Sequence, residues 1–266
     1  MDNRLVDYAG PAATGGPFAR LTLDSPHNRN ALSTALVSQL HQGLRDAVAE
    51  PAVRAVVLAH RGGTFCAGAD LSEASSDGSP PSAFDVAIGR GRELAALLRA
   101  IVSAPLPVIA AVDGHVRAGG LGLVGACDIA VAGPRSSFAL TEARIGVAPA
   151  IISLTLLPKM SPRAAARYYL TGETFDAGRA AEIGLVTVAV DDVDAAVADL
   201  VADVGRGSPQ GLAATKALTT AAVLAGFDRD AERLSEESAR LFVSDEAREG
   251  MLAFLQKRPP SWATPG

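Results

Sequence analysis

Two glycine-bearing loops carry the residues whose types and spacing could do chemistry. The first spans 61–70 and follows the apolar stretch 53–59, and the second spans 113–122 and follows the apolar stretch 107–112. Glycine lets the backbone approach a ligand closely, and the first N–H groups of a following helix or turn lack partners. Each loop can therefore present one donor. Two convergent donors would stabilise negative charge on a carbonyl oxygen, for example that of a thioester enolate.

Glu142 is the candidate group for proton transfer. It follows the expected strand 137–140 after one residue, Thr141, so it is expected at the end of that strand, close to the ends of the two strands that lead into the loops. A carboxylate in that place could act as a general acid or base on a carbon atom near the polarised carbonyl. The alternative is an ordinary carboxylate that caps a turn at the end of a strand.

The segment 120–125 also matches the pattern G-x-G-x-x-G, which occurs in dinucleotide-binding folds. Its context does not fit such a fold, because six residues separate Val112 from Gly119 and a new strand is expected near Asp128. Only a short helix can occupy the space between them. A second alternative is that these glycines merely allow helices to pack closely.

The elements that must position these loops follow from hydrophobic periodicity. Ala19, Leu21 and Leu23 alternate with other residues and predict a strand over 18–23. A helix is expected from Ser33 to Pro51, because apolar residues recur there at helical spacing. The remaining expectations are strands at 53–59, 107–112, 128–131 and 137–140 and helices at 84–102, 193–204, 209–225, 228–243 and 245–257. We therefore expect an α/β core over 1–190 and a helical region over 191–266.

The segment 72–82 is rich in Ser, Asp, Gly and Pro. It is too polar to pack in a core and too long for a tight turn. We expect a mobile surface segment that could act as a lid.

Composition narrows the class of protein. The chain has 266 residues, 48% of them hydrophobic, and a formal net charge of −5, which predicts a globular protein without the basic surface that nucleic acids or acidic membranes require. No apolar run approaches the roughly 18 residues of a membrane span, and no signal peptide is recognisable. Cys66 and Cys127 could form one disulfide at most. A reducing, cytoplasmic location is therefore expected.

Several segments of the chain together resemble the enoyl-CoA hydratase/isomerase family, also called the crotonase family. They occur in the family's order and span most of the chain: 30–32, 65–71, 107–114 with Gly119 and Gly120, 127–132, 138–146 and 180–186. The resemblance implies a spiral of ββα units capped by a C-terminal helical trimerisation region. It also implies an acyl-CoA substrate and a homotrimer or dimer of trimers. Because coenzyme A is part of the substrate, no separate cofactor is expected.

The resemblance also implies roles for individual residues. The amides of Ala69 and Gly119 would hold the thioester oxygen, and Glu142 would be the catalytic carboxylate. The main chain near Ala67, Ala69 and Leu71 would meet the adenine. The other residues implied in substrate binding are Arg29 near the CoA phosphates, Asp70, and Gly122 near the acyl group. Asp70 also suits the N-cap of a helix that begins near Leu71.

The departures from the family pattern leave the reaction open. Two-carboxylate hydratases have a glutamate at the position of Gly122, Ala118 replaces the first residue of the usual Gly-Gly-Gly run, and 147–153 replaces a glycine-rich segment. The leading hypothesis is a hydratase that uses Glu142 alone, with a resemblance to methylglutaconyl-CoA-type hydratases. The alternatives are a Δ3,Δ2-enoyl-CoA isomerase, which needs one base, and a CoA-thioester-binding protein without catalysis.

Other polar residues have plainer interpretations. His115 and Arg117 flank the second loop, and we expect a solvated or core-satisfied pair on a connecting turn. The alternative is that they bind a distal carboxylate or orient water. The run 167–170, with Tyr168 and Tyr169, is more typical of helix packing than of a ligand site. The four histidines and two cysteines show no metal-binding spacing, so no metal site is expected.

Overall fold

Most of the predicted strands belong to one large sheet. The computed structural model describes residues 4–70 and 82–263. Its larger sheet has six strands in the order β1-β2-β3-β5-β7-β10, of which only β1 and β2 pair antiparallel. The strands are β1 (Val6–Ala9), β2 (Phe18–Leu23), β3 (Ala55–His60), β5 (Val108–Val112), β7 (Ile129–Ala132) and β10 (Val188–Ala189). The alternation predicted for β2 is present, since Ala19, Leu21 and Leu23 are all buried.

A smaller sheet contains the short strands that follow β3, β5 and β7 along the chain. Its order is β4-β6-β8-β9, where β8 and β9 pair antiparallel. These strands are β4 (Thr64–Cys66), β6 (His115–Arg117), β8 (Ser137–Ala139) and β9 (Phe175–Asp176). Thus β3, β5 and β7 in the large sheet each lead directly into β4, β6 and β8 in the small one. This repetition is the expected spiral of ββα units.

Helices cover both sheets, and their ends agree with the capping signals in the sequence. Ser33 accepts a hydrogen bond from the amide of Leu36 at the start of α2, and Ser82 forms a capping box with Asp85 at the start of α3. The helices outside the C-terminal third are α1 (Pro11–Thr14), α2 (Thr34–Ala49), α3 (Ala83–Ser103), α4 (Gly119–Ala126), α5 (Ser153–Leu156), α6 (Pro162–Thr171) and α7 (Ala177–Glu182), with 3-10 turns η1 (Pro26–Asn28) and η2 (Glu142–Ile145).

The C-terminal third is helical, as predicted, but it contains one helix fewer than expected. Its helices are α8 (Val193–Gly205), α9 (Pro209–Phe242) and α10 (Asp245–Leu255). The predicted separation between 209–225 and 228–243 is wrong, because α9 continues through Gly226. One glycine inside a helix costs only about 1 kcal/mol, and the next residue, Phe227, is anchored in the core with 2% of its surface exposed. Tertiary packing outweighs the local break signal.

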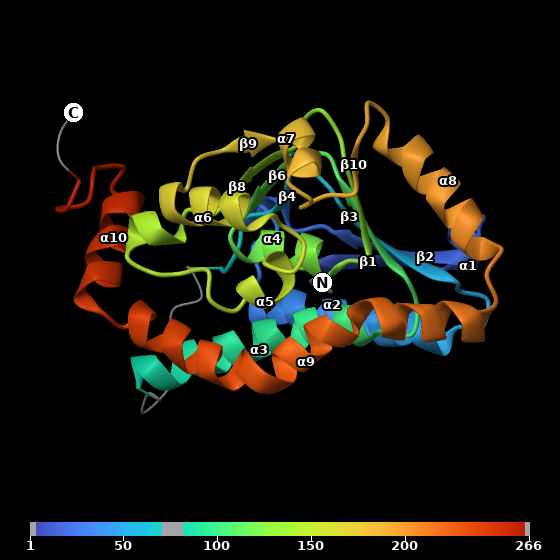
Figure 1. Cartoon of the computed structure of the whole chain (residues 1–266), viewed down its shortest axis with the longest axis horizontal. Helices are drawn as coiled ribbons and strands as arrows, with labels where there is room; N and C mark the ends of the chain where they lie inside the picture. Colours follow the sequence, from blue (N-terminus) through green and yellow to red (C-terminus); the bar gives the residue numbers. More distant parts are fainter. Residues whose placement is uncertain (1–3, 71–81, 264–266) are drawn as a thin grey trace.

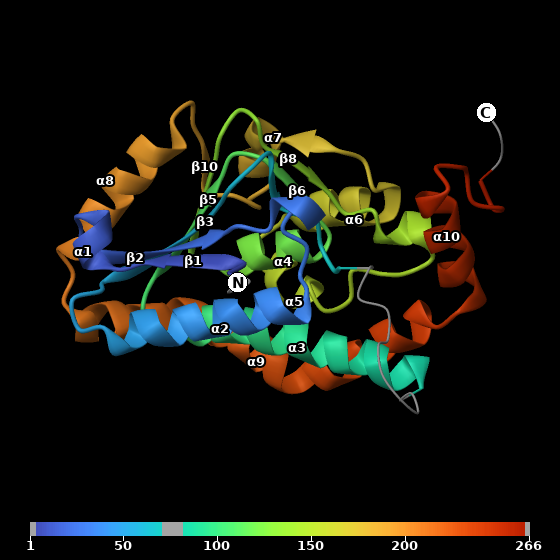
Figure 2. The same cartoon turned by 180° about the vertical axis from the view of Figure 1, so that it is seen from behind.

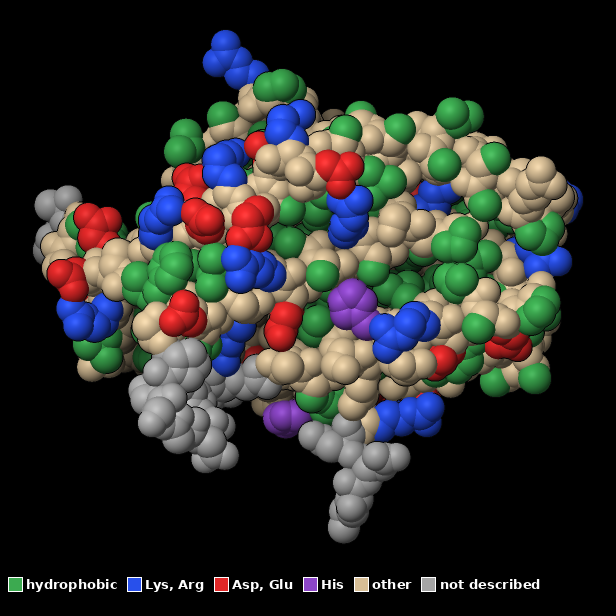
Figure 3. Space-filling view, turned by 90° about the horizontal axis from the view of Figure 1, so that it is seen from below, with side chains coloured by type: hydrophobic (Ala, Val, Ile, Leu, Met, Phe, Trp, Pro, Cys, Tyr) green, Lys and Arg blue, Asp and Glu red, His purple; other side chains and the backbone are tan. Residues whose placement is uncertain are grey.

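The long helices lie together beneath the large sheet. In Figures 1 and 2, α9 runs alongside α3 on the lower side, while α8 and α10 lie at opposite ends of the molecule. Basic and acidic side chains are interspersed with hydrophobic ones on the underside (Figure 3). Ion pairs such as Arg99–Asp228, 2.7 Å, and Arg92–Glu232 link α3 to α9. No described helix is long and apolar enough to cross a membrane. The expected lid, 72–82, lies outside the described residues except for Ser82.

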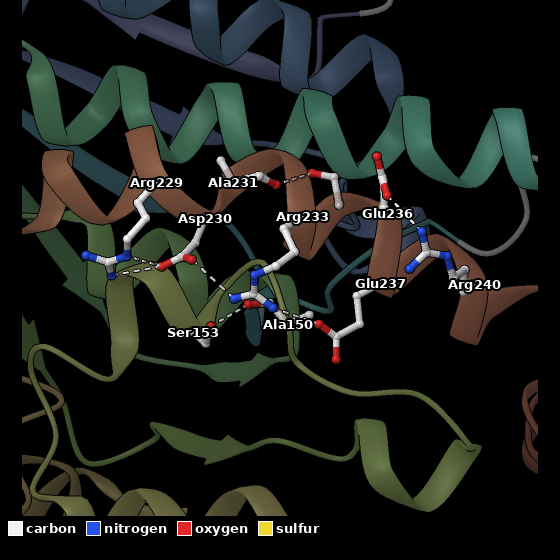
Figure 4. A network of polar contacts seen from close by, with 10 residues as sticks. Ala150, Ser153, Arg229, Asp230, Ala231, Arg233, Glu236, Glu237 and Arg240 are labelled. Carbon is white, nitrogen blue, oxygen red and sulfur yellow. Dashed lines mark hydrogen bonds and ion pairs between the residues drawn. The ribbon is translucent and has the colours of Figure 1, made fainter.

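Helix α9 also packs against the turn 150–153 (Figure 4). A polar network along α9 includes Arg233, which pairs with Glu237 at 3.1 Å, and it lies over the turn from Ala150 to Ser153 (Figure 4). Within that turn, the hydroxyl of Ser153 donates to the carbonyl of Ala150 at 2.5 Å. On the neighbouring helix, a Cβ at Gly91 would lie 3.1 Å from Ile151. The segment 150–153 is thus enclosed between α3 and α9.

Candidate active site

The backbone of Ala69 is held by a single bridge to Leu32. The amide of Leu32 donates to the carbonyl of Gly68 at 2.7 Å, and the amide of Asp70 donates to the carbonyl of Leu32 at 3.4 Å. In such a parallel bridge the flanking residues make both hydrogen bonds, so the amide of Ala69 itself points away from Leu32. This bridge is what sets the direction of the Ala69 N–H.

The amide of Gly119 lies beside that of Ala69. A Cβ on Gly119 would be 3.9 Å from the Ala69 nitrogen, and a Cβ on Gly68 would be 3.4 Å from the Gly119 nitrogen. Gly119 is the first residue of α4, where an N–H has no acceptor within the helix. Within residues 4–70 and 82–263, neither amide has a hydrogen-bond partner. The two loops predicted to converge are therefore neighbours, each with a free donor.

Ala118 turns the chain into α4. Its φ of 46° and ψ of −121° lie outside the regions that L-residues with side chains favour. Its amide donates to the carbonyl of Ala139 at 3.4 Å, and its carbonyl accepts from Leu121 at 2.9 Å. These bonds hold a strained residue directly before the donor of Gly119, and glycine would adopt the same conformation without that strain.

Glu142 is buried at the end of β8. It is the first residue of η2, and 8% of its surface is exposed. Burial raises the pKa of Glu142 from its usual 4.5 to about 7, against a smaller lowering by its own backbone amide. Its Oε2 atom has no hydrogen-bond partner among the described residues. A carboxyl group with a pKa near neutrality can both take up and release a proton at physiological pH.

Gly122 stands where a second carboxylate would be expected, and that space is occupied. A Cβ on Gly122 would lie 2.5 Å from Cγ2 of Ile152 and 3.2 Å from Cδ1 of Leu98. The hydroxyl of Thr155 donates to the carbonyl of Gly122 at 3.1 Å and fixes this contact. No side chain fits at position 122 unless Ile152 moves. Gly120 and Gly125 make similarly close contacts, which supports the interpretation that these glycines allow tight packing.

The other residues implied in substrate binding cluster near Ala69. Arg29 is exposed in a left-handed conformation, with φ of 58°, and its carbonyl accepts from the amide of Ala67 at 3.1 Å. Asp70 is buried and accepts a hydrogen bond from the side-chain amide of Asn28 at 2.9 Å. Leu71 and the helix that Asp70 was expected to cap lie outside the described residues.

Helix α10 packs directly on the turn that carries Glu142. A Cβ on Gly250 would lie 2.5 Å from the carbonyl carbon of Ile145, and a Cβ on Gly146 would lie 2.6 Å from the carbonyl carbon of Glu246. The backbones of α10 and η2 are therefore in direct contact at Gly250 and Gly146. Because of this contact, the position of Glu142 depends on the C-terminal helix as well as on the strand that precedes it.

His115 and Arg117, beside the second loop, have local hydrogen-bond partners. His115 Nδ1 lies 2.7 Å from the hydroxyl of Ser137, and Arg117 donates to the carbonyls of Ser137 and Val116 at 2.7 and 2.8 Å. Both side chains thus tie β6 to β8. No group of three possible metal ligands occurs in the described part of the chain.

Tyr169, expected from the sequence to serve helix packing, has a polar group that this packing leaves without a partner. Its hydroxyl is buried without a hydrogen-bond partner, and its pKa is raised by burial and, secondly, by the charge of Glu142. Its neighbour Tyr168 packs on Phe175 with ring centroids 4.1 Å apart. No pattern in the chain indicates that one tyrosine of the pair faces Glu142 while the other faces the core.

A spiral of paired strands, with a helical C-terminal region, defines the class as a crotonase-fold protein. The family model described as "Enoyl-CoA hydratase/isomerase" matches residues 14–265, and the chain belongs to that family. The sequence is 79% identical to the solved structure of an enoyl-CoA hydratase from Mycobacterium avium, with a TM-score of 0.92 and coverage of 99% of this chain and 100% of that one.

Two curated relatives differ in the reaction that they are named for. Enoyl-CoA hydratase EchA19 of Mycobacterium tuberculosis is 33% identical over 253 residues, which cover 91% of each protein. The 1,2-epoxyphenylacetyl-CoA isomerase of Escherichia coli is 30% identical over 251 residues, which cover 91% of this chain and 93% of that protein. Similarity at this level establishes the family but leaves the reaction to be argued from the site.

Proposed function

We propose that this chain is an enoyl-CoA hydratase that uses Glu142 as its one catalytic carboxylate. The observation that carries the proposal is the pair of adjacent, unpartnered amides at Ala69 and Gly119. Two such donors form an oxyanion hole for the thioester oxygen, where negative charge develops as C3 is attacked. The exposed Arg29 and the backbone near Ala67 would contact the CoA moiety.

The reaction balances with one carboxylate. The Glu142 carboxylate takes a proton from water as the water oxygen bonds to C3, and the electron pair of the double bond moves onto the thioester, whose oxygen the two amides stabilise. The protonated Glu142 then delivers the proton to C2, and the carbonyl re-forms. The product is a 3-hydroxyacyl-CoA, and Glu142 returns to its carboxylate form. A pKa of Glu142 raised to about 7 suits a group that carries out both transfers.

An isomerase is the second candidate. Ile152 fills the place of a second carboxylate, and a Δ3,Δ2-enoyl-CoA isomerase requires only one base to move a proton from C2 to C4. The third candidate is a protein that binds CoA thioesters without catalysis. The methylglutaconyl-CoA-type substrate, the homotrimer or dimer of trimers, and the cytoplasmic location also stay predictions.

The test uses crotonyl-CoA, a 3-enoyl-CoA and 3-methylglutaconyl-CoA, each incubated with the protein in D2O. Deuterium at C2 together with a hydroxyl at C3 is the result expected of a hydratase, and movement of the double bond alone identifies an isomerase. Tight binding without exchange would leave only the binding protein. Glu142→Gln should abolish turnover while CoA-ester binding persists, and full turnover in this variant would refute Glu142 as the base.

A further inference from the structure

Two of the three buried side-chain polar atoms without a hydrogen-bond partner, among the described residues, belong to η2 and α6, which pack on each other. They are Oε2 of Glu142 and the hydroxyl oxygen of Tyr169, and the third is Nδ1 of His60. Leaving one such group without a partner in a folded protein is costly, because it gives up its hydrogen bonds to water. The unpartnered groups of Glu142 and Tyr169 are therefore expected to share a polar partner that enters when the site is occupied.

Helix α6, which carries Tyr169, packs on η2, which begins with Glu142. Arg144 on η2 donates from Nε to the carbonyl of Thr171 at 2.9 Å, which ties the end of α6 to the turn that begins with Glu142. A Cβ on Gly172 would be 2.8 Å from the same Nε atom. The negative charge of Glu142 raises the pKa of Tyr169 further than burial alone does, as expected for close neighbours.

Three arginines, one on α6, one on η2 and one beside α10, have partners of their own. On α6, Arg167 pairs with Glu173 at 2.7 Å. Beside α10, Arg258 pairs with Glu249 at 2.7 Å. Arg144 is directed at the end of α6, as described above. Glu142 Oε2 and the hydroxyl of Tyr169 have no hydrogen-bond partner among the described residues, so both are available to a polar group that enters the site.

We propose that the Tyr169 hydroxyl is a second catalytic contact of the site, which holds the reacting water together with Glu142. The inference rests on the proposed function. A tyrosine hydroxyl has one donor and can also accept. It can donate to the carboxylate or accept from the water that lies between them, and it stays protonated throughout. Tyr169 thus supplies the second polar contact that Gly122 cannot provide, because Ile152 fills that side.

The first experiment compares Tyr169→Phe with Tyr168→Phe in hydration of the enoyl-CoA that the wild type accepts. Each change removes one hydroxyl from the same helix. The Tyr168 hydroxyl accepts from Nε of Arg179 at 3.0 Å, away from Glu142, so it is the matched control. We expect kcat to fall about 10- to 100-fold in Tyr169→Phe, as for loss of a hydrogen bond to a charged group, with KM within about twofold. Tyr168→Phe should keep the wild-type kcat.

The pH profile separates a catalytic contact from mere packing. The hydration rate should rise as Glu142 loses its proton, with a midpoint near the pKa of about 7. Loss of a donor to the carboxylate disfavours the charged form, so the midpoint should move to higher pH in Tyr169→Phe and stay in place in Tyr168→Phe. An unchanged kcat and an unchanged midpoint in Tyr169→Phe would overturn the inference while the hydratase proposal stands.

A direct titration keeps the inference testable if no enoyl-CoA is turned over. In that case the proposed function fails, and the carboxyl carbon of Glu142 can still be followed by NMR in the folded protein, with Glu142→Gln to assign the signal. The expected result is a higher pKa of Glu142 in Tyr169→Phe than in wild type. Equal pKa values would show that the hydroxyl does not interact with the carboxyl group.

Discussion

Gly250 of α10 lies so close to Ile145 of η2 that no side chain fits between them. A Cβ there would stand 2.5 Å from a backbone carbon, which cannot rotate away as a side chain would. The contact joins the C-terminal helix to the turn that begins with Glu142. A helix remote in sequence therefore contributes to the position of Glu142, the proposed catalytic residue.

Gly250→Ala should push α10 away from η2. We expect a loss of about 1–3 kcal/mol in the free energy of unfolding, typical of overpacking, together with a lower kcat because Glu142 shifts with its turn. Urea denaturation and hydration assays measure the two effects. Gly226→Ala is the control, since its nearest neighbour is 4.0 Å away and alanine favours a helix. Equal effects of the two changes would contradict the proposed link between α10 and Glu142.

Gly122→Ala should be destabilising because of Ile152. The added methyl group would meet Cγ2 of Ile152 at 2.5 Å, and we expect a cost of about 1–3 kcal/mol. In an Ile152→Ala background the same change should cost much less, because the clashing atoms are gone. A double-mutant cycle from denaturation curves measures this coupling. Additive effects would mean that Ile152 does not occupy the space next to Gly122.

Glu142→Gln should stabilise the protein at alkaline pH. Because folding raises the pKa of Glu142 from 4.5 to about 7, the folded state binds more protons than the unfolded state between these values, and stability falls as pH rises through that window. The penalty approaches roughly 3 kcal/mol above pH 7, because each tenfold change in proton affinity is worth about 1.4 kcal/mol. Glutamine carries no charge at any pH, so the variant escapes it.

Denaturation curves at pH 4 and pH 8.5 test this expectation. The Glu142→Gln variant should have a larger free energy of unfolding than the wild type only at the higher pH. Glu246→Gln, at an exposed position on α10, should change stability by less than about 0.5 kcal/mol at both. A pH-independent difference between Glu142→Gln and wild type would indicate that burial does not alter the proton affinity of the carboxyl group.

Ala118→Gly should relieve backbone strain beside the Gly119 donor. Alanine at φ 46° and ψ −121° carries a cost of about 1–3 kcal/mol, which exceeds the entropy that glycine adds to the unfolded chain, about 0.5–1 kcal/mol. We expect a net gain of about 1 kcal/mol in stability with the site geometry preserved. Ala139→Gly, in the paired strand β8, should instead destabilise. A loss of stability in Ala118→Gly would show that the strain is absent.

Local patterns were sufficient to predict most elements, because each is governed by residues near in sequence. The alternation in 18–23 and the Ser33 cap of α2 depend on neighbours within a few positions, and both are present. The continuous helix α9 was not predicted, since the burial of Phe227 against distant elements outweighs the effect of Gly226. Helix breaks are predicted poorly wherever packing supplies the deciding free energy.

The sequence by itself determined the two strand-loop units, the acidic residue that ends a third strand and the helical C-terminal third, because turn chemistry and periodicity are local properties. Only the tertiary structure decided that Ala69 and Gly119 present neighbouring amides, that Ile152 fills the space beside Gly122, and that Tyr169 rather than Tyr168 lies near Glu142. Those relationships depend on how separate elements pack. Close packing between residues far apart along the chain leaves no periodic trace in it.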